Sequence, residues 1–230
     1  MVDPNLLSRL VGMLTTLERE IPLAEGVCRA CARAFGARGG ALTFAPMTLE
    51  QMTVTTGDET TQRMEDLQEV LGEGPGLLAF SRERAVATVV GSQASSIEFP
   101  DFPAFASGAA TSGLSAAVVA APLRLERRPL GVLTLYQEAD RAPLRPDAAQ
   151  QLADTASTIL LSSSTPVEQW WPDDGRRHRA IGMVMAQLGA TAGDALAVLR
   201  ARALAGSCTL RSVIDDVLHR RTDFGSDDDS

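Results

Sequence analysis

Residues 116–138 read AAVVAAPLRLERRPLGVLTLYQE, and this stretch decides the fold. Two runs rich in valine, leucine and alanine flank the basic pair Arg127-Arg128, which predicts two strands joined by a short turn. Shorter runs with strand character lie at residues 39–46, 51–58 and 85–90.

Helical periodicity surrounds these strands. Apolar residues at three- and four-residue spacing predict helices over about 5–20, 23–35, 60–71 (behind threonine caps) and 146–161. The order helix, helix, strand, strand, helix, strand, strand, strand, helix predicts an α+β domain. We expect an antiparallel sheet with helices on its faces.

The amino-acid composition limits the class of protein to which this chain can belong. The chain has 230 residues, 45% of them hydrophobic, which is enough for a substantial core. No apolar run approaches the ~20 residues of a membrane span. The N-terminus also lacks the basic and apolar regions of a secretory signal. We expect a soluble, cytoplasmic protein with no membrane partner.

The net charge of −8 hides an asymmetry along the chain. Residues 176–221 carry eight arginines against three aspartates, a net +5. Residues 1–175 carry −9 and the tail 223–230 carries −4. A basic segment on an acidic body attracts phosphate, although the same arginines can also simply solvate helix surfaces.

The basic segment reads RRHRAIGMVMAQLGATAGDALAVLRARALAGSCTLRSVIDDVLHRR and predicts three short amphipathic helices. Gly189 and Gly206 end the first two helices, and Thr191 and Thr209 open the next two. Helices this short are not stable singly, so we expect a small bundle.

Ser, Pro and Gly punctuate residues 162–175, which predicts a boundary between two domains. The predicted organisation is an α+β sensor and dimerisation domain at 1–165, a linker at 166–175, a helical domain at 176–222 and an acidic disordered tail at 223–230. The adjacent Trp170 and Trp171 favour packing between the domains over stacking on a base.

Three cysteines do not make a disulfide framework in a chain of this length. Cys28 and Cys31 form a C-x-x-C inside a helical pattern, and no second pair completes a zinc site. We expect two small buried residues on one helix face. The sequence contains no nucleophile with a base and no ligand cluster, so no enzyme activity, metal or cofactor is predicted.

The C-terminal segment resembles the ANTAR domain of bacterial RNA-binding regulators. The resemblance rests on A-x-G-x-V-M at 180–185, A-L-x-x-L-R at 195–200 and L-x-x-V at 210–213. It departs at Ile181, where lysine or threonine is more usual, and at Ile214, where alanine is favoured. The resemblance implies homodimers that bind paired stem-loops in nascent transcripts and prevent transcription termination.

The first 165 residues are similar to a GAF domain of the kind that precedes ANTAR in actinobacterial proteins. The matching stretches are GEGPG at 72–76, FPDF at 99–102, GLSAAVVAAPL at 113–123 and PLGVLTLY at 129–136. Gly76 replaces the cysteine of the related GEGPC motif. The resemblance implies a small-molecule cavity between sheet and helices, for a ligand that no residue identifies. The three glycines of GEGPG are interpreted as turn formers, because no phosphate-loop pattern follows them.

Two sets of residues follow from these interpretations. The predicted RNA contacts are Arg176, Arg177, His178, Arg179, Arg200, Arg202, Arg211, Arg220 and Arg221. The residues predicted to shape helix packing are Ala180, Gly182, Met185 and Leu199. Arginine planes both stack on bases and pair with phosphates, which suits the loops of folded RNA. Arg200 is expected to rest partly on the core.

Two other functions remain open. Three helices with arginines also fit a helix-turn-helix, which predicts binding to duplex DNA rather than stem-loop RNA. Alternatively, the chain is a small-molecule sensor whose C-terminal bundle only dimerises, in which case the arginines at 176–179 are dispensable.

Overall fold

A computed structural model of the chain describes residues 5–16, 21–44, 51–91, 99–142, 145–164, 175–222 and 224. The strands are β1 (Gly39–Phe44), β2 (Met52–Thr56), β3 (Val86–Val90), β4 (Ala116–Leu125) and β5 (Arg128–Gln137). The helices before the last three are α1 (Leu6–Thr15), α2 (Leu23–Ala34), α3 (Glu59–Leu71), α4 (Pro75–Ser81), α5 (Pro103–Thr111) and α6 (Pro146–Ser162). The predicted α+β class is confirmed for the described residues.

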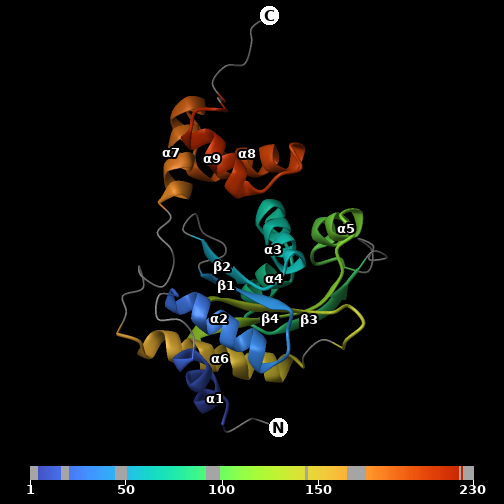
Figure 1. Ribbon diagram of the computed structural model, residues 1–230. Helices are drawn as coiled ribbons and strands as arrows, with labels where there is room; N and C mark the ends of the chain where they lie inside the picture. Colours follow the sequence, from blue (N-terminus) through green and yellow to red (C-terminus); the bar gives the residue numbers. More distant parts are fainter. Residues whose placement is uncertain are drawn as a thin grey trace, which may run out of the picture.

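The five strands form one antiparallel sheet in the order β2-β1-β5-β4-β3 (Figure 1). The β4–β5 hairpin lies at its centre, as the long apolar pair predicted. Its turn is Glu126-Arg127 rather than Arg127-Arg128, because Arg128 already pairs with Leu125. Glu126 supplies the left-handed backbone of this turn, with φ 57°.

Helices cover both faces of the sheet (Figure 1). Alternate side chains explain the two layers, since successive residues of a strand point to opposite faces. Val119, Ala121 and Leu133 pack with α1, α2 and α6 on one face. Val118 and Tyr136 pack with α3 and α5 on the other.

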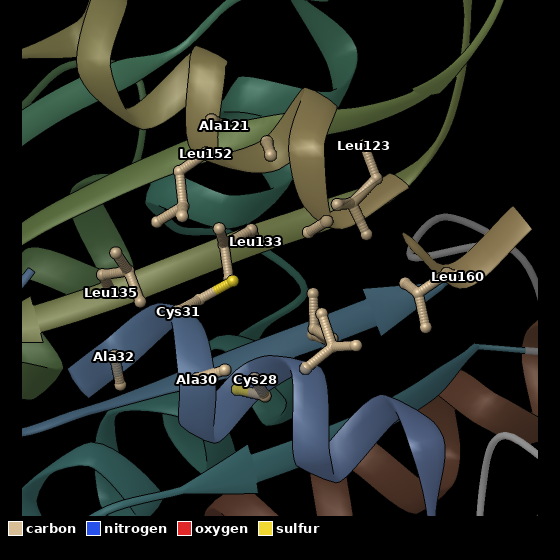
Figure 2. Close-up of a cluster of buried hydrophobic side chains, with 14 of the residues drawn as sticks. Cys28, Ala30, Cys31, Ala32, Ala121, Leu123, Leu133, Leu135, Leu152 and Leu160 are labelled. Atoms are coloured by element: carbon tan, nitrogen blue, oxygen red, sulfur yellow. The ribbon is translucent and has the colours of Figure 1, made fainter. Parts of the chain in front are cut away.

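The larger core lies between the sheet and the α2 and α6 helices (Figure 2). Figure 2 shows the side chains of Cys28 and Cys31 on α2 among the leucines of β5 and α6. Both cysteines are 0% exposed and unpaired. The prediction of two small buried residues on one helix face is therefore confirmed.

Two helices, α4 and α5, were not predicted. Each begins with a proline at its first position, where a missing N–H costs nothing. Both are short, and α5 reads PAFASGAAT, whose small residues carry little amphipathic pattern. The start of α3 also differs from the prediction, because Asp58 caps it by accepting from Thr61 N–H at 2.9 Å.

The three C-terminal helices are α7 (Arg176–Leu188), α8 (Ala192–Ala205) and α9 (Leu210–Leu218). They pack on one another around a shared apolar core that contains Val184, Leu199, Val213 and Val217. The local signals act as predicted. Gly189 ends α7 in the left-handed region at φ 63°, and Thr191 and Thr209 cap the next two helices through their side chains.

Several predictions fall outside the described residues. They concern most of the linker 166–175, the packing of Trp170 and Trp171, and the tail 223–230 apart from Phe224. Among the described helices, none is by itself long and apolar enough to cross a membrane; only α7 and α8 taken together, bent by 101°, meet that test of length and composition.

Candidate functional site

Most of the basic side chains predicted to contact RNA lie on the surface of the C-terminal bundle. They come from the start of α7, from α8, from the first turn of α9 and from the residues after α9. The exposed ones are His178, Arg179, Arg202, Arg211, Arg220 and Arg221. Exposed basic side chains of this kind are suited to contacting a phosphate backbone.

Acidic side chains of the bundle engage part of this set. Arg176 forms an ion pair with Asp215 on α9, which ties α7 to α9. Arg221 Nε lies 2.8 Å from Asp216 Oδ1. Such exposed pairs contribute at most about 1 kcal/mol, so they hold these arginines only loosely.

Two of the predicted contacts face the α/β body instead of solvent. The Arg177 side chain is only 8% exposed, and its Nη1 lies 2.7 Å from Glu69 Oε1 on α3. Arg200 is half-buried and rests against Gly72, the left-handed residue that ends α3. Burial and the neighbouring Arg177 lower the pKa of Arg200, while Glu69 opposes them. The Arg200 guanidinium thus lies against α3, a contact that the expectation of a stem resting on the bundle core did not include.

The residues predicted to shape helix packing divide into two groups. Ala180 and Leu199 are fully buried, and Met185 packs against the same core while half-exposed. Gly182 is a correction: it lies on the exposed face of α7, and a Cβ there would meet nothing within 4 Å. The packing role predicted for this glycine is therefore not seen in the structure.

The two positions at which the chain departs from the ANTAR pattern are both core positions. Ile181 is 3% exposed and Ile214 is 7% exposed, and both belong to the apolar core of the bundle. The larger side chains are therefore accommodated by packing rather than displayed on the surface.

A cavity of about 230 Å³ lies between the sheet and α3. Polar side chains dominate its wall: threonines from β1, β2 and β5, and carboxyl groups from α2 and α3. Arg211 of α9 also lines it, so the C-terminal bundle contributes to its wall. The lining residues used below are Glu65, Asp66, Gln68, Glu69, Thr134 and Arg211. The volume suits a small molecule of few heavy atoms.

A buried hydrogen-bond network stands behind one wall of this cavity, and its members Glu65 and Gln68 line the cavity. Tyr136 donates to Glu65 Oε1 at 2.5 Å, and Gln68 Nε2 lies 2.8 Å from the Tyr136 hydroxyl and 3.1 Å from Glu65. Gln68 Oε1 accepts from Gly76 N–H at 2.9 Å. Burial raises the pKa of Glu65 from 4.5 to about 7, although the bonds from Tyr136 and Gln68 favour the charged form.

The GEGPG motif supports this network structurally. Gly72 ends α3 at φ 66°, and Gly74 adopts φ 144°. A Cβ on Gly74 would lie 2.5 Å from Gln68 Oε1, so only glycine leaves room for that side chain. Glu73 Oε1 accepts from Phe105 N–H at 2.7 Å in the first turn of α5. The prediction that Gly76 is a turn former is wrong, because this glycine lies within α4.

The pKa values of Asp66 and Glu69, two further residues of the wall, are also raised. Burial raises the pKa of Asp66, while Gln62 and Arg211 oppose it. Burial likewise raises the pKa of Glu69, and Arg177 is the strongest opposing charge. Arg211 and Arg177 therefore reach carboxyl groups of α3 from the C-terminal bundle.

The described part of the chain contains no cluster of three or more metal-ligating side chains. The Cys28 and Cys31 thiols are shielded from solvent, and burial raises the pKa of Cys28 to about 12. Thiol chemistry needs an accessible thiolate, which neither residue offers in this fold.

No family model matches the chain, and no curated protein matches it. Solved structures are similar to it. The GAF domain of an Acinetobacter phosphoenolpyruvate-protein phosphotransferase is 14% identical over 71% of this chain and 96% of its own, with a TM-score of 0.42. Free methionine-R-sulfoxide reductase from Neisseria meningitidis is 16% identical over 68% of this chain and 88% of its own, with a TM-score of 0.42.

Escherichia coli SdiA is 16% identical over 93% of this chain and 90% of its own, with a TM-score of 0.46. At these identities and scores, the three likenesses are descriptions of backbone arrangement. They assign no ligand, partner or reaction to this protein.

Sequence reasoning missed two features of the site. One is the Tyr136–Glu65–Gln68 network, whose partners are 71 and 68 residues apart. The other is the contact of Arg177 with Glu69, which are 108 residues apart. The run of acidic residues in α3, MEDLQEV, was the signal that this helix carries more than core positions.

Proposed function

We propose that this protein is an RNA-binding regulator of transcription antitermination, in which a GAF-like α/β domain controls an ANTAR-like helical domain. Helices α7–α9 bind stem-loop RNA in nascent transcripts, in the cytoplasm. The α/β domain receives a small-molecule signal in the cavity beside α3. The sequence resemblances described above support this pairing of a sensor with an RNA reader.

The observation that carries the proposal is the separation of charge along the chain. The segment 176–221 has a net charge of +5 on a body with a net charge of −9. Six of its predicted contact residues are exposed, among them Arg179, Arg202 and Arg220. An acidic body repels phosphate, so a nucleic acid is directed to the bundle.

Stem-loop RNA fits this surface better than a long duplex does. Guanidinium planes stack on unpaired loop bases and pair with flanking phosphates. The exposed His178 next to Arg179 adds a flat ring at the start of α7. Helices α7–α9 bind the bases of the RNA loop. This binding stabilises the antiterminator fold of the transcript and thereby disfavours the terminator hairpin.

A second copy of the chain belongs to the same proposal, because two bundles would engage two stem-loops at once. Helix α1 has apolar residues on both sides. Leu6 and Leu10 are buried against the body, while Leu7 and Val11 are 46% and 43% exposed. A Leu7→Glu variant is expected to sediment as a monomer where the unchanged chain sediments as a dimer; a monomer in both cases contradicts dimerisation.

The test of function is binding of the full chain to a tandem stem-loop RNA across a salt titration. Scrambled loops and duplex DNA of matched length are the competitors. Replacing Arg179 with Glu is expected to weaken binding by about tenfold or more and to flatten the salt dependence. Arg84→Glu, an equal charge change on the exposed surface of the body, is the matched control.

Each result has a distinct meaning. Loop-dependent binding that Arg179→Glu weakens supports the RNA reader. Preference for duplex DNA supports a DNA-binding regulator instead. Equal loss in both variants assigns the effect to net charge and contradicts a specific site on α7.

A further inference from the structure

The C-terminal bundle docks on α3 of the α/β body. Helices α8 and α9 contact α3, and Figure 1 shows α3 directed toward these two helices. Val70 of α3 belongs to the apolar core that the three C-terminal helices share. The contact between α3 and the bundle therefore includes packing of apolar side chains in a continuous core, in addition to contacts between charged residues.

Arg177 and Arg200 are two charged residues of this docking interface, and Arg211 is a third. Arg177 Nη1 contacts Glu69 Oε1 at 2.7 Å, with 8% of the Arg177 side chain exposed. Arg200 lies so close to Gly72 that a Cβ on this glycine would be 2.9 Å from Arg200 Nη1. Both arginines are consequently turned toward α3 and away from any ligand of the exposed bundle surface.

The interface is electrostatically incomplete. The Arg177 and Arg200 guanidinium groups repel each other, and Glu69, which is ion-paired with Arg177, attracts both of them. Within the described part of the chain, Nε and Nη2 of Arg177 and Nε of Arg200 are buried without a hydrogen-bond partner. Buried donors without partners disfavour the arrangement that buries them. Undocking would return both guanidinium groups to water, so the closed arrangement depends on apolar packing at Val70 together with the Arg177–Glu69 ion pair.

We propose that docking of α7–α9 on α3 is an autoinhibitory contact, which withholds Arg177 and Arg200 from RNA until the bundle is released. The proposal rests on the RNA-binding function above and adds its regulation. RNA phosphates offer each guanidinium group two acceptors at once, whereas in the docked form Arg177 contacts Glu69 through one nitrogen and its other two nitrogens are buried without partners among the described residues. The RNA-competent form is therefore the undocked one.

The cavity is placed to control this contact. Glu69 lines the cavity and also pairs with Arg177, and Arg211 reaches the same cavity from α9. A molecule that engages Glu69 from the cavity side competes with Arg177 for the same carboxylate. Glu69 is therefore the residue through which a ligand bound in the cavity would weaken docking of the bundle.

The experiment removes the charge of Glu69 and follows docking and RNA binding separately. Docking is measured on the full chain as the distance between spin labels on Cys208, which is exposed, and on Arg127→Cys in the β4–β5 turn. Cys28 and Cys31 are buried and stay unlabelled. RNA affinity is measured on unlabelled protein with the tandem stem-loop RNA.

Glu69→Gln leaves Arg177 buried beside a neutral amide, which destabilises the docked form. We expect a longer and broader label distance and RNA binding tighter by about tenfold, the factor for a closed form populated to about nine tenths. Glu59→Gln is the matched control, because it removes the same charge from an exposed position on the same helix. Circular dichroism establishes that each variant is folded, and Glu69→Asp, which keeps the charge, is expected to stay docked.

Two results overturn the proposal while leaving RNA binding intact. One is an unchanged label distance in Glu69→Gln, and the other is a longer distance with unchanged RNA affinity. A longer distance with RNA bound by neither the variant nor the unchanged chain overturns the RNA-binding function itself. The failures of the two proposals are thereby distinguished.

Discussion

Tyr136 on β5 donates a hydrogen bond of 2.5 Å to Glu65 on α3; both side chains are buried, and Glu65 also lines the cavity. Gln68 joins the pair from the next turn of α3. This contact attaches the helix that carries the C-terminal bundle to the centre of the sheet. The network thus connects the core of the α/β domain to the surface of α3 on which the bundle docks.

The first prediction concerns stability and pH. Burial raises the pKa of Glu65 from 4.5 to about 7, so the folded state holds its proton more tightly than the unfolded state. The corresponding stability is fully present below pH 4.5 and is lost as pH rises through about 7. The shift is equivalent to roughly 3 kcal/mol. Urea denaturation at several pH values is expected to show stability falling across this window.

Glu65→Gln keeps the neutral shape and still accepts from Tyr136. It is expected to lose most of this dependence and to be more stable than the unchanged chain above pH 7. Glu59→Gln, exposed on the same helix, is expected to keep the full dependence. The same pH slope in Glu65→Gln and in the unchanged chain would contradict the assignment.

The second prediction concerns the cysteines. Cys208 is exposed, whereas Cys28 and Cys31 are buried in the core shown in Figure 2. A thiol reagent is expected to modify one cysteine per chain under native conditions and three in denaturant, because burial keeps two thiols protonated and out of reach. A Cys208→Ser variant should then show no reaction until it unfolds; rapid native labelling of that variant would refute the burial of the pair.

The third prediction concerns the core of the C-terminal bundle. Leu199 is 0% exposed and lies among residues of all three helices. Leu199→Ala is expected to reduce the free energy of unfolding by about 2–5 kcal/mol through lost burial and a cavity. Leu204→Ala is the control on the same helix, since Leu204 is 57% exposed, and should change stability by less than about 0.5 kcal/mol. Similar losses in both variants would mean that the bundle lacks the described core.

The fourth prediction concerns Gly182, for which the sequence predicted a role in helix packing that the structure does not show. Because a Cβ there meets nothing within 4 Å, Gly182→Ala is expected to stabilise the bundle by about 0.5–1 kcal/mol through helix propensity. The opposite sign is expected for Gly131→Ala, where a Cβ would lie 2.3 Å from the Thr43 carbonyl oxygen. Thermal unfolding of the two variants measures both. Destabilisation by Gly182→Ala would restore the packing role.

Sequence patterns predicted the elements that have strong local signals. The α2 and α6 helices and the Thr191 and Thr209 caps appear where the spacing placed them, and the β4–β5 hairpin appears with its turn one residue earlier than predicted. Helices α4 and α5 were missed, because short helices of small residues gain their stability from packing rather than from pattern. The role of Gly182 was misjudged for a related reason: a glycine in a helix has the same local signal whether it faces a neighbour or solvent.

The same distinction between local sequence signals and tertiary packing applies to the candidate site. The basic character of α7–α9 follows from composition alone, because charges are counted without knowing where they lie. Which arginines remain exposed was decided by tertiary structure, since Arg177 meets Glu69 across 108 residues of chain. Local sequence determined the helices, strands and caps, which depend on neighbours a few residues away. Packing determined the cavity, the buried Glu65 and the docked bundle, because these depend on surfaces that meet only in the folded chain.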